Sequence, residues 1–477
     1  MPQRWTQSPK VAVVGGGLAG LAAACALSDS GLRVTLFERR PYLGGRASSY
    51  HHPGTGEVVD NCQHVLFGCC TNLIEFYRHI GVNGRIRWYD WMTFVEPGGR
   101  TSVLRPSFFP APLNTLPSFL RFPFLNTWDK LAIGRAMMAL APAPLPDTGE
   151  SFLTWLQRHG QTEQSIARFW KPALVSALSE DLDRVSVPSA AQVVRETVKS
   201  AAARTMGIPT IPLGELYSQA GDYTSAHGGE VRLRSTVEEF RAEVAGVKLS
   251  LDGNEESFDF AIIAVPFEAL GRMLPETSAA DPLRKMLGHF ETSPITGIHL
   301  WFDRQITDLD HAVLLDRTIQ WMFHKSKLLE RPAAGTNGSG ASAGEANGSY
   351  VELVVSSSKT LVDKSKTEIT DLAVAELREF FPGARPAHLV KSAVIKEIHA
   401  TYSPRPGIDA YRPQPETVWP RVFLTGDWTA TGWPATMEGA VRSGYIAAQC
   451  VARAAGVRNA AFLVPDLPPT GFMRLFG

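Results

Sequence analysis

The sequence predicts an α/β protein in which a parallel, doubly wound sheet is combined with a second domain of α+β type. Three observations predict this fold class: a glycine-rich turn after an apolar run, an acid at the end of the next apolar run, and a Gly-Asp pair before a helix of small residues. These features lie in the segments 11–20, 34–38 and 422–452.

Length and composition narrow the function further. The chain of 477 residues exceeds the size at which one hydrophobic core stops growing, so we expect more than one domain. Hydrophobic residues make up 44% and charged residues 20%, as in ordinary globular proteins. Basic and acidic residues balance at 47 each, so no net charge attracts a polyanion. We therefore expect a small-molecule ligand and no nucleic acid.

The five cysteines show no C-x-x-C spacing. We therefore expect neither a disulfide framework nor a metal site, and we expect a reducing, cytoplasmic compartment. Residues 1–10 contain no apolar core of a signal peptide. No run of about 18 uncharged apolar residues occurs, so we expect no transmembrane helix. Attachment to a membrane surface stays open.

The first element is a βαβ unit whose turn has the pattern G-x-G-x-x-G. Gly15 permits the tight turn, Gly17 lets the backbone approach a pyrophosphate, and Gly20 lets the helix lie close to the strand. Leu18 and Ala19 lie between the last two glycines, where the N-terminal N–H groups of the helix face the anion. This unit predicts a dinucleotide site.

The second strand ends on Glu38, which can accept hydrogen bonds from a ribose diol and so favours adenosine without a 2′-phosphate. Arg39 follows, and Gly44-Gly45-Arg46 comes soon after. This continuation resembles the E-x(5)-G-G-R motif of the flavin amine oxidase and carotenoid desaturase superfamily. The resemblance implies FAD as the cofactor, with Arg39 among its contacts. It also implies that the glycines border the flavin phosphates and ring, with Arg46 near the pyrophosphate.

A Gly-Asp pair near the other end of the sequence closes the same site. Asp427, after Gly426, can accept hydrogen bonds from ribityl hydroxyls. Backbone N–H groups at the start of the following helix, around Thr436 and Met437, can face the electron-rich flavin pyrimidine. The run resembles the superfamily's C-terminal G-D motif and its E-G-A-x-x-S-G helix.

A third piece lies between these two. The segments 228–233 and 258–266 have strand character and flank an alternating stretch at 244–251. The resemblance implies that Val237 contacts adenine. Three separated segments thus form one FAD domain of the glutathione-reductase-like Rossmann type, and the rest forms a substrate domain with a mixed sheet and helices. We expect the FAD domain at 1–98, 206–275 and 401–460, the substrate domain at 99–205 and 276–400, and a tail at 461–477.

Two further segments stand out by composition. Residues 105–144 gather large apolar side chains among seven prolines. They are either core of the substrate domain or a patch that dips into a bilayer, with Arg121, Lys130 and Arg135 at headgroup level. Residues 331–349 are almost all glycine, serine, alanine and asparagine, which predicts a flexible surface loop.

Several stretches are similar to hydroxysqualene dehydroxylase, the squalene-associated FAD-dependent desaturase family of hopanoid synthesis. Residues 59–68 resemble that family's D-N-G-Q-H motif, with Cys62 in place of the glycine. This resemblance places Gln63 among the cofactor contacts. Further similar stretches are 169–172 with 177–178, 400–402 with 406–413, and the run G-D-W-T-A-T-G-W-P-A-T at 426–436.

The resemblance implies reductive removal of an allylic hydroxyl from a C30 polyprenoid, with hydride from reduced FAD and an unidentified electron donor. The leaving oxygen must be protonated, so an acid near the flavin is needed. His64 is the leading candidate because imidazole titrates near neutral pH, although it could also hydrogen-bond without transferring a proton. Asp60 could orient it or simply bond to the backbone at the strand end. Glu180 is weaker, since with Asp181 it is typical of a solvated helix end, and a bound water is a further proton source.

Three other functions share these features. A carotenoid-type desaturase or saturase has the same fold and an apolar substrate such as phytoene or diapophytoene. As a desaturase it moves hydride from carbon to FAD. A flavin amine oxidase is disfavoured because no aromatic pair is clearly placed as an amine cage. A prenyl-lipid carrier needs no intact flavin site, whereas the motif residues are all present. For a polyprenoid substrate we expect peripheral attachment to the inner face of the cytoplasmic membrane.

Overall fold

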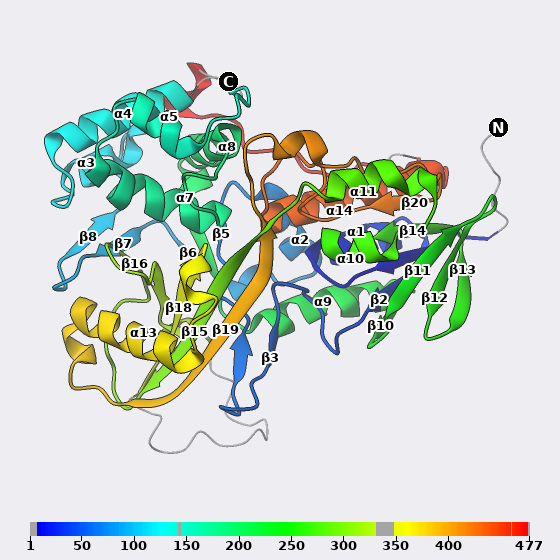
Figure 1. Ribbon diagram of the computed structural model, residues 1–477, viewed down its shortest axis with the longest axis horizontal. Helices are drawn as coiled ribbons and strands as arrows, with labels where there is room; N and C mark the ends of the chain where they lie inside the picture. Colours follow the sequence, from blue (N-terminus) through cyan, green and yellow to red (C-terminus); the bar gives the residue numbers. More distant parts are fainter. Residues whose placement is uncertain (1–6, 142–144, 331–347, 459, 476–477) are drawn as a thin grey trace.

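One half of the molecule is built around a parallel sheet. The computed structural model describes residues 7–141, 145–330, 348–458 and 460–475 (Figure 1). Five parallel strands follow the order β10–β2–β1–β14–β20, so strands from three distant segments pair around the first strand of the chain. The predicted fold class is confirmed. The strands are β1 (Lys10–Val14), β2 (Arg33–Glu38), β10 (Glu230–Leu233), β14 (Phe260–Ile263) and β20 (Val422–Leu424).

The two faces of this sheet carry different layers, because alternate side chains of a strand point to opposite sides. Val11 and Val13 pack beneath helices, whereas Ala12 and Val14 pack against a meander and short helices. The first layer comprises α1 (Leu18–Asp29), α2 (Thr71–His79), α9 (Leu213–Ala226) and α14 (Met437–Ala454). The second comprises β11 (Val237–Ala242), β12 (Val247–Leu251), β13 (Asn254–Phe258), α10 (Phe267–Met273) and α11 (Asp281–Leu287).

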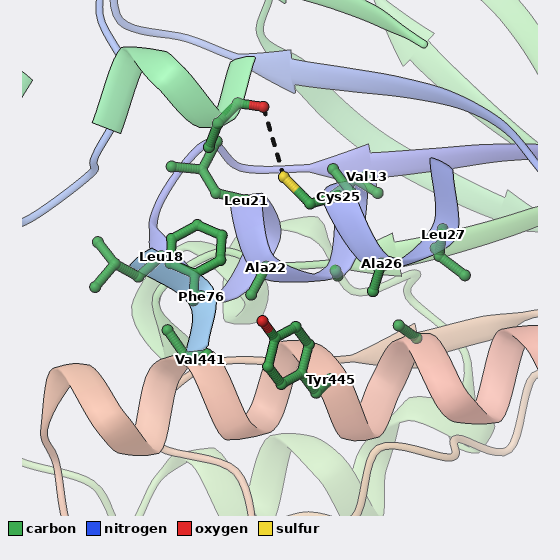
Figure 2. Close-up of a cluster of buried hydrophobic side chains, with 14 of the residues drawn as sticks. Val13, Leu18, Leu21, Ala22, Cys25, Ala26, Leu27, Phe76, Val441 and Tyr445 are labelled. Carbon is green, nitrogen blue, oxygen red and sulfur yellow. Dashed lines mark hydrogen bonds between the residues drawn. The ribbon is translucent and has the colours of Figure 1, made fainter. Parts of the chain in front are cut away.

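Helices α1 and α14 pack closely because small residues line their contact. A Cβ atom at Gly444 would lie 2.2 Å from the carbonyl oxygen of Ala19, so only glycine fits there. Figure 2 shows Val441 and Tyr445 of α14 beside Leu18 and Ala22 of α1. Figure 2 also shows that the two helices run in the same direction, and because each follows a strand of the parallel sheet, their N-termini lie at the same end of that sheet.

The second half is built on a seven-stranded sheet of order β19–β15–β18–β17–β16–β7–β8. Helix α13 (Lys366–Phe380) covers one face, and the helices of residues 116–198 pack on the other. The strands are β7 (Met92–Val95), β8 (Thr101–Leu104), β15 (Thr292–Phe302), β16 (His311–Leu314), β17 (Trp321–Phe323), β18 (Ser349–Ser356) and β19 (Leu389–Tyr402). The helices are α3 (Leu116–Leu120), α4 (Thr127–Leu140), α5 (Phe152–Arg158), α6 (Glu163–Ser165), α7 (Lys171–Leu178) and α8 (Val187–Val198).

Two of the expected domain boundaries shift in the structure. The boundary at 98/99 falls inside the β7–β8 hairpin, and both strands belong to the seven-stranded sheet. The boundary at 275/276 leaves out α11, whose Leu287 packs with the meander of the nucleotide half. Residues 97–99 have the composition of a linker, but they form the turn of this hairpin. The strands on either side of the turn pair with each other, so the chain does not pass to another domain there.

Short elements connect the two halves. A two-stranded sheet pairs β3 (Ser49–His51) with β4 (Val58–Asp60). A three-stranded sheet places β9 (Met206–Pro209) between β5 (Leu66–Phe67) and β6 (Ile86–Tyr89). Helix α12 (Lys325–Leu328) contacts β18.

The apolar segment 105–144 divides between core and surface within its described part, 105–141. Phe122, Phe124 and Leu125 are buried in the core of the second half. Ile133 and Leu140 are buried there too, but many other large apolar side chains of the segment are exposed. The tail joins them because the N–H of Phe472 donates to the carbonyl of Ala111. We call this exposed group the apolar patch: Phe108, Phe109, Leu113, Leu116, Leu120, Trp128, Leu131, Met138, Phe472 and Leu475.

Three further expectations concern the loop at 331–349, membrane-spanning helices and metal sites. Of the predicted loop 331–349, residues 331–347 lie outside the described residues, and Ser349 begins β18. No helix in the described ranges is long and apolar enough to cross a membrane. Nor does the described part of the chain gather three or more histidine, cysteine or acidic side chains that could hold a metal ion.

Candidate active site

A cavity of about 1880 Å³ extends through both halves of the molecule. It begins at the carboxyl ends of β1 and β2, where doubly wound sheets bind ligands, and continues among the helices of the second half. Every predicted cofactor contact except Gly20 lines it. These lining residues are Gly15, Gly17, Leu18, Ala19, Glu38, Arg39, Gly45, Arg46, Gln63, Val237, Gly426, Asp427, Thr436 and Met437.

The glycines of the first turn have distinct steric roles. Gly15 has φ +115°, and a Cβ there would lie 2.4 Å from the carbonyl oxygen of Ala264. A Cβ at Gly20 would lie 1.9 Å from the carbonyl oxygen of Gly15, so Gly20 permits close packing behind the cavity wall. Gly17 differs, because a Cβ would meet nothing nearer than Gly45 Cα at 3.8 Å. Space is therefore kept open at Gly17 on the cavity side.

Glu38 is held by backbone donors at the end of β2. Its Oε2 accepts a hydrogen bond from the N–H of Gly16 at 2.8 Å, and its Oε1 accepts one from the N–H of Arg40 at 2.8 Å. The side chain is buried yet lines the cavity. These two bonds fix the carboxylate and leave further lone pairs for hydroxyl donors of a ligand.

Arg46 and Asp427 form an ion pair across the cavity wall. Arg46 also donates to the carbonyl of Ala400 at 3.0 Å. The sequence assigned separate roles to the two residues, at a pyrophosphate and at ribityl hydroxyls. In the structure the two side chains bind each other, so each has fewer hydrogen-bonding groups left for a ligand. A ligand would therefore contact the Arg46–Asp427 pair and not two independent side chains.

The N-terminus of α14 opens into the cavity. Thr436 is its N-cap, because its Oγ1 accepts a hydrogen bond from the N–H of Gly439 at 3.0 Å. Met437 follows and also lines the cavity. Free backbone N–H groups at this end carry a partial positive charge, which suits an electron-rich ring or an anion.

His64 faces the cavity as a neutral ring. Its Nδ1 lies 2.7 Å from the carbonyl oxygen of Cys62, which can only accept, so Nδ1 carries the hydrogen. Burial lowers the pKa of His64 below its ordinary value. The second ring nitrogen, Nε2, then carries the free lone pair and is the atom at which the neutral ring can accept a proton.

The two carboxylates proposed beside His64 have other partners. Asp60 accepts hydrogen bonds from Ser49 Oγ at 2.6 Å, from the N–H of Leu213 at 3.0 Å and from Lys325 Nζ at 2.7 Å. Asp60 therefore has no direct hydrogen bond to His64 among the described residues, and its bond from the N–H of Leu213 is the backbone contact that the sequence left open as the alternative.

Glu180 is also placed differently from the prediction. It is fully buried, whereas the sequence pattern favoured a solvated helix end. It accepts hydrogen bonds from Lys359, from Ser403 and from the N–H of Asp181, and it does not line the cavity. Glu180 therefore links the end of α7 to the segment after β19 and is removed from the list of candidate acids.

Two residues that contribute to the site were missed from sequence. Arg412 is buried and donates to the carbonyls of Asp427, Thr429 and Trp433 at 3.1, 2.6 and 2.7 Å. Arg412 lies in one of the stretches that resemble the dehydroxylase family, which could have drawn attention to it. Nothing in the sequence, however, indicates the carbonyl groups to which it donates. Met473 of the tail lines the cavity, and nothing in the local sequence indicates this.

A model of flavin-containing amine oxidoreductases matches residues 18–452. The chain belongs to this family. As a member of the flavin-containing amine oxidoreductases, it is a flavoprotein, and its cofactor is FAD. The residues present fit FAD, because the open space at Gly17, the fixed carboxylate of Glu38 and the N-terminus of α14 line one continuous cavity.

Relatives of this flavin-containing oxidoreductase include carotenoid enzymes. The 15-cis-phytoene desaturase of Synechococcus elongatus is 28% identical, with 93% of this chain and 95% of the relative covered. The probable zeta-carotene desaturase of the same organism is 27% identical, covering 94% and 99%. The match therefore runs through both domains.

Solved structures of the same fold include a wild-type putrescine oxidase bound to putrescine and a putative protoporphyrinogen oxidase of Exiguobacterium sp. 255-15. The first has a TM-score of 0.68 at 17% identity, and the second 0.67 at 17%; each match covers 94% of this chain and 99% of the other. At this identity the similarity establishes the fold alone.

Proposed function

We propose that this FAD-dependent oxidoreductase is a carotenoid-type desaturase that introduces double bonds into a long polyprenoid hydrocarbon. The observation that carries the proposal is the apolar cavity, which runs from His64 to the apolar patch. Its walls in the second half come from large apolar side chains, among them Phe119, Met137, Phe169, Trp170 and Ile295. The phytoene and zeta-carotene desaturases among the relatives support the same substrate class.

Desaturation removes a hydride, which bound FAD accepts, and a proton from the neighbouring carbon. His64 offers a neutral acceptor for that proton at Nε2, because its Nδ1–H is engaged with Cys62. The apolar walls exclude water from the reacting carbons, which protects a cationic intermediate from capture. Arg46 and Asp427 hold the flavin end of the cavity through their ion pair.

Reductive dehydroxylation of hydroxysqualene is the second candidate. A specific observation favours it: two stretches that resemble that enzyme family, 406–413 and 426–436, are joined by hydrogen bonds of Arg412. This reaction needs a proton donor for the leaving hydroxyl, whereas His64 rests in its neutral form. We therefore place desaturation first.

Anaerobic half-reactions separate the two candidates. If the protein is a desaturase, oxidised holoenzyme mixed with phytoene or diapophytoene should lose flavin absorbance and yield a product with an added double bond. Photoreduced holoenzyme mixed with hydroxysqualene should stay reduced. Flavin reoxidation with formation of squalene would instead establish the second candidate, and an amine substrate that bleaches the flavin would contradict both.

We also propose that the apolar patch rests on a phospholipid surface from which the substrate enters. Several residues are both exposed and part of the cavity lining, so the mouth of the cavity lies within the patch: Leu113, Leu116, Leu120, Leu131 and Met138. Arg121 and Arg135, two of the three basic residues expected at headgroup level, are exposed, and so is Arg105 nearby. The third, Lys130, is half-buried and donates to the carbonyl of Leu120 at 2.8 Å. Contiguous exposed apolar surface of this kind needs a partner.

Replacing Phe108, Leu120 and Trp128 together by serine should lower binding to anionic phospholipid vesicles at least about tenfold, since their exposed apolar area no longer enters the bilayer. Vesicle co-sedimentation measures this. Replacing Val244 and Val418 by serine is the matched control, because both are exposed outside the patch. Equal binding by the triple variant and the wild-type protein would contradict the proposal.

A further inference from the structure

A buried group of charged side chains joins the two halves of the molecule behind the cavity. The ammonium of Lys325, at the start of α12, lies 2.7 Å from Asp60 Oδ2 at the end of β4. It also lies 3.2 Å from Glu352 Oε2 on β18. Their side chains are at most 4% exposed. Charges this deep are costly to bury, and a buried ion pair is often no more stabilising than apolar packing, so another role is indicated.

The third partner of Lys325 connects this group to the cavity. Lys325 Nζ donates to Gln63 Oε1 at 2.8 Å, and Gln63 Nε2 donates to the carbonyl of His64 at 3.0 Å. Gln63 and His64 line the cavity, whereas Lys325, Asp60 and Glu352 do not. The ammonium thus lies directly behind the wall that presents the His64 ring.

Within this buried group, Lys325 and Asp60 carry the main charges at neutral pH. Burial raises the pKa of Glu352 to about 7, so this carboxyl is only partly ionised at neutral pH. His299 Nε2 lies 4.0 Å from Glu352 Oε1, and burial together with Lys325 lowers the pKa of His299 to about 3, which keeps it neutral. Burial alone would raise the pKa of Asp60, but the neighbouring Lys325 holds it below its ordinary value.

We propose that Lys325 is a positioning residue for the reaction: by joining Asp60, Glu352 and Gln63 behind the cavity wall, it holds the Gln63–His64 turn so that the His64 ring faces the substrate. The proposal rests on the proposed function only for the role of His64. It concerns residues of the chain alone, and its test does not require a substrate.

The arrangement has an electrostatic signature that a purely structural role would lack. The charges facing His64 are Asp60, Lys325 and Arg46, and its Nδ1–H is bonded to the carbonyl of Cys62. Asp60 raises the pKa of His64, whereas Lys325 and Arg46 lower it. Neutralising Asp60 should therefore lower the pKa of His64, and neutralising Lys325 should raise it.

The test is a ring titration of holoenzyme containing isotopically labelled histidine, followed by NMR. The His64 signal is identified by its loss in His64→Gln. Asp60→Asn should move the midpoint to lower pH and Lys325→Met to higher pH, each by about one unit. Because Lys325→Met leaves two buried carboxyls without their cation, Lys325→Met/Glu352→Gln is prepared as well and should shift the midpoint in the same direction.

Lys359→Met is the matched control, since Lys359 pairs with Glu180 and Asp181 and lies outside the cavity wall. It should leave the His64 midpoint unchanged. Unchanged midpoints in folded Asp60→Asn and in the double variant, or shifts of the same sign in both, would overturn the proposal. Because no substrate is present, failure of the desaturase assay leaves this result unaffected.

Discussion

Replacing Gly17 by alanine should give a folded protein that purifies without flavin. A Cβ at Gly17 meets nothing nearer than 3.8 Å within the protein, so the fold accommodates it. The methyl group would, however, fill the space through which the backbone approaches the pyrophosphate of FAD. We expect FAD affinity to fall at least about 100-fold, or about 2.7 kcal/mol. The ratio of flavin to protein absorbance and titration of the apoprotein with FAD measure this.

Two glycine variants make that result specific. A Cβ at Gly84 also meets nothing within 4 Å, and Gly84 does not line the cavity, so Gly84→Ala should retain flavin. At Gly20 the added Cβ would lie 1.9 Å from the carbonyl oxygen of Gly15, so Gly20→Ala should lower the melting temperature as well as flavin content. Full flavin content in Gly17→Ala would show that this turn does not hold the pyrophosphate.

Replacing His64 by glutamine should lower turnover about 10²- to 10⁴-fold while FAD stays bound, because it removes the side chain that we propose as the proton acceptor. Product formation from the substrate identified in the half-reactions measures the effect, and flavin absorbance verifies the cofactor. His79→Gln is the matched control: His79 ends α2, its ring contacts Tyr223 and Asp29, and it does not line the cavity. Full turnover in His64→Gln would remove this residue from the mechanism.

The pH dependence of turnover tests whether His64 acts as a base or as an acid. Burial lowers its pKa, so the ring stays neutral from the ordinary histidine range upward. A base acts in this neutral form, so turnover should remain level near neutral pH and fall only as pH drops through the lowered pKa. An acid would require the protonated form, and turnover would then be lost as pH rises through that same pKa.

The local motifs allowed much of the nucleotide half to be predicted. The turn at Gly15, Gly17 and Gly20 combines a tight bend with close backbone approach, and few residue types satisfy both. The acid at the end of β2 is likewise fixed by its position on a strand, which places Glu38 beside the turn. Such features depend on neighbours within one βαβ unit, and the sequence displays those neighbours directly.

Partners of charged groups could not be predicted in this way. Arg46 pairs with Asp427, which is 381 residues away, and Asp60 bonds to Lys325, which is 265 residues away. Both acids were assigned to other partners from their local motifs. A buried carboxylate must have donors, but any segment of the folded chain can supply them.

Which side chains are buried also depends on packing between segments that are distant in the sequence. Glu180 has the local pattern of an exposed helix end, yet Lys359 and Ser403 come from distant segments and enclose it. The apolar segment 105–144 could be interpreted as core or as surface, and in its described part Phe124 is buried while Phe108 is 91% exposed.

The sequence by itself therefore determined the α/β class and the dinucleotide turn, because short-range backbone geometry imposes those residue types. Its motifs implied FAD and the three-piece domain through their resemblance to a flavoprotein superfamily. Only the tertiary structure decided which charges pair behind His64, which carboxyls face the cavity and where that cavity opens. These depend on desolvation by distant segments, and the local sequence of a residue does not specify which segments will enclose it.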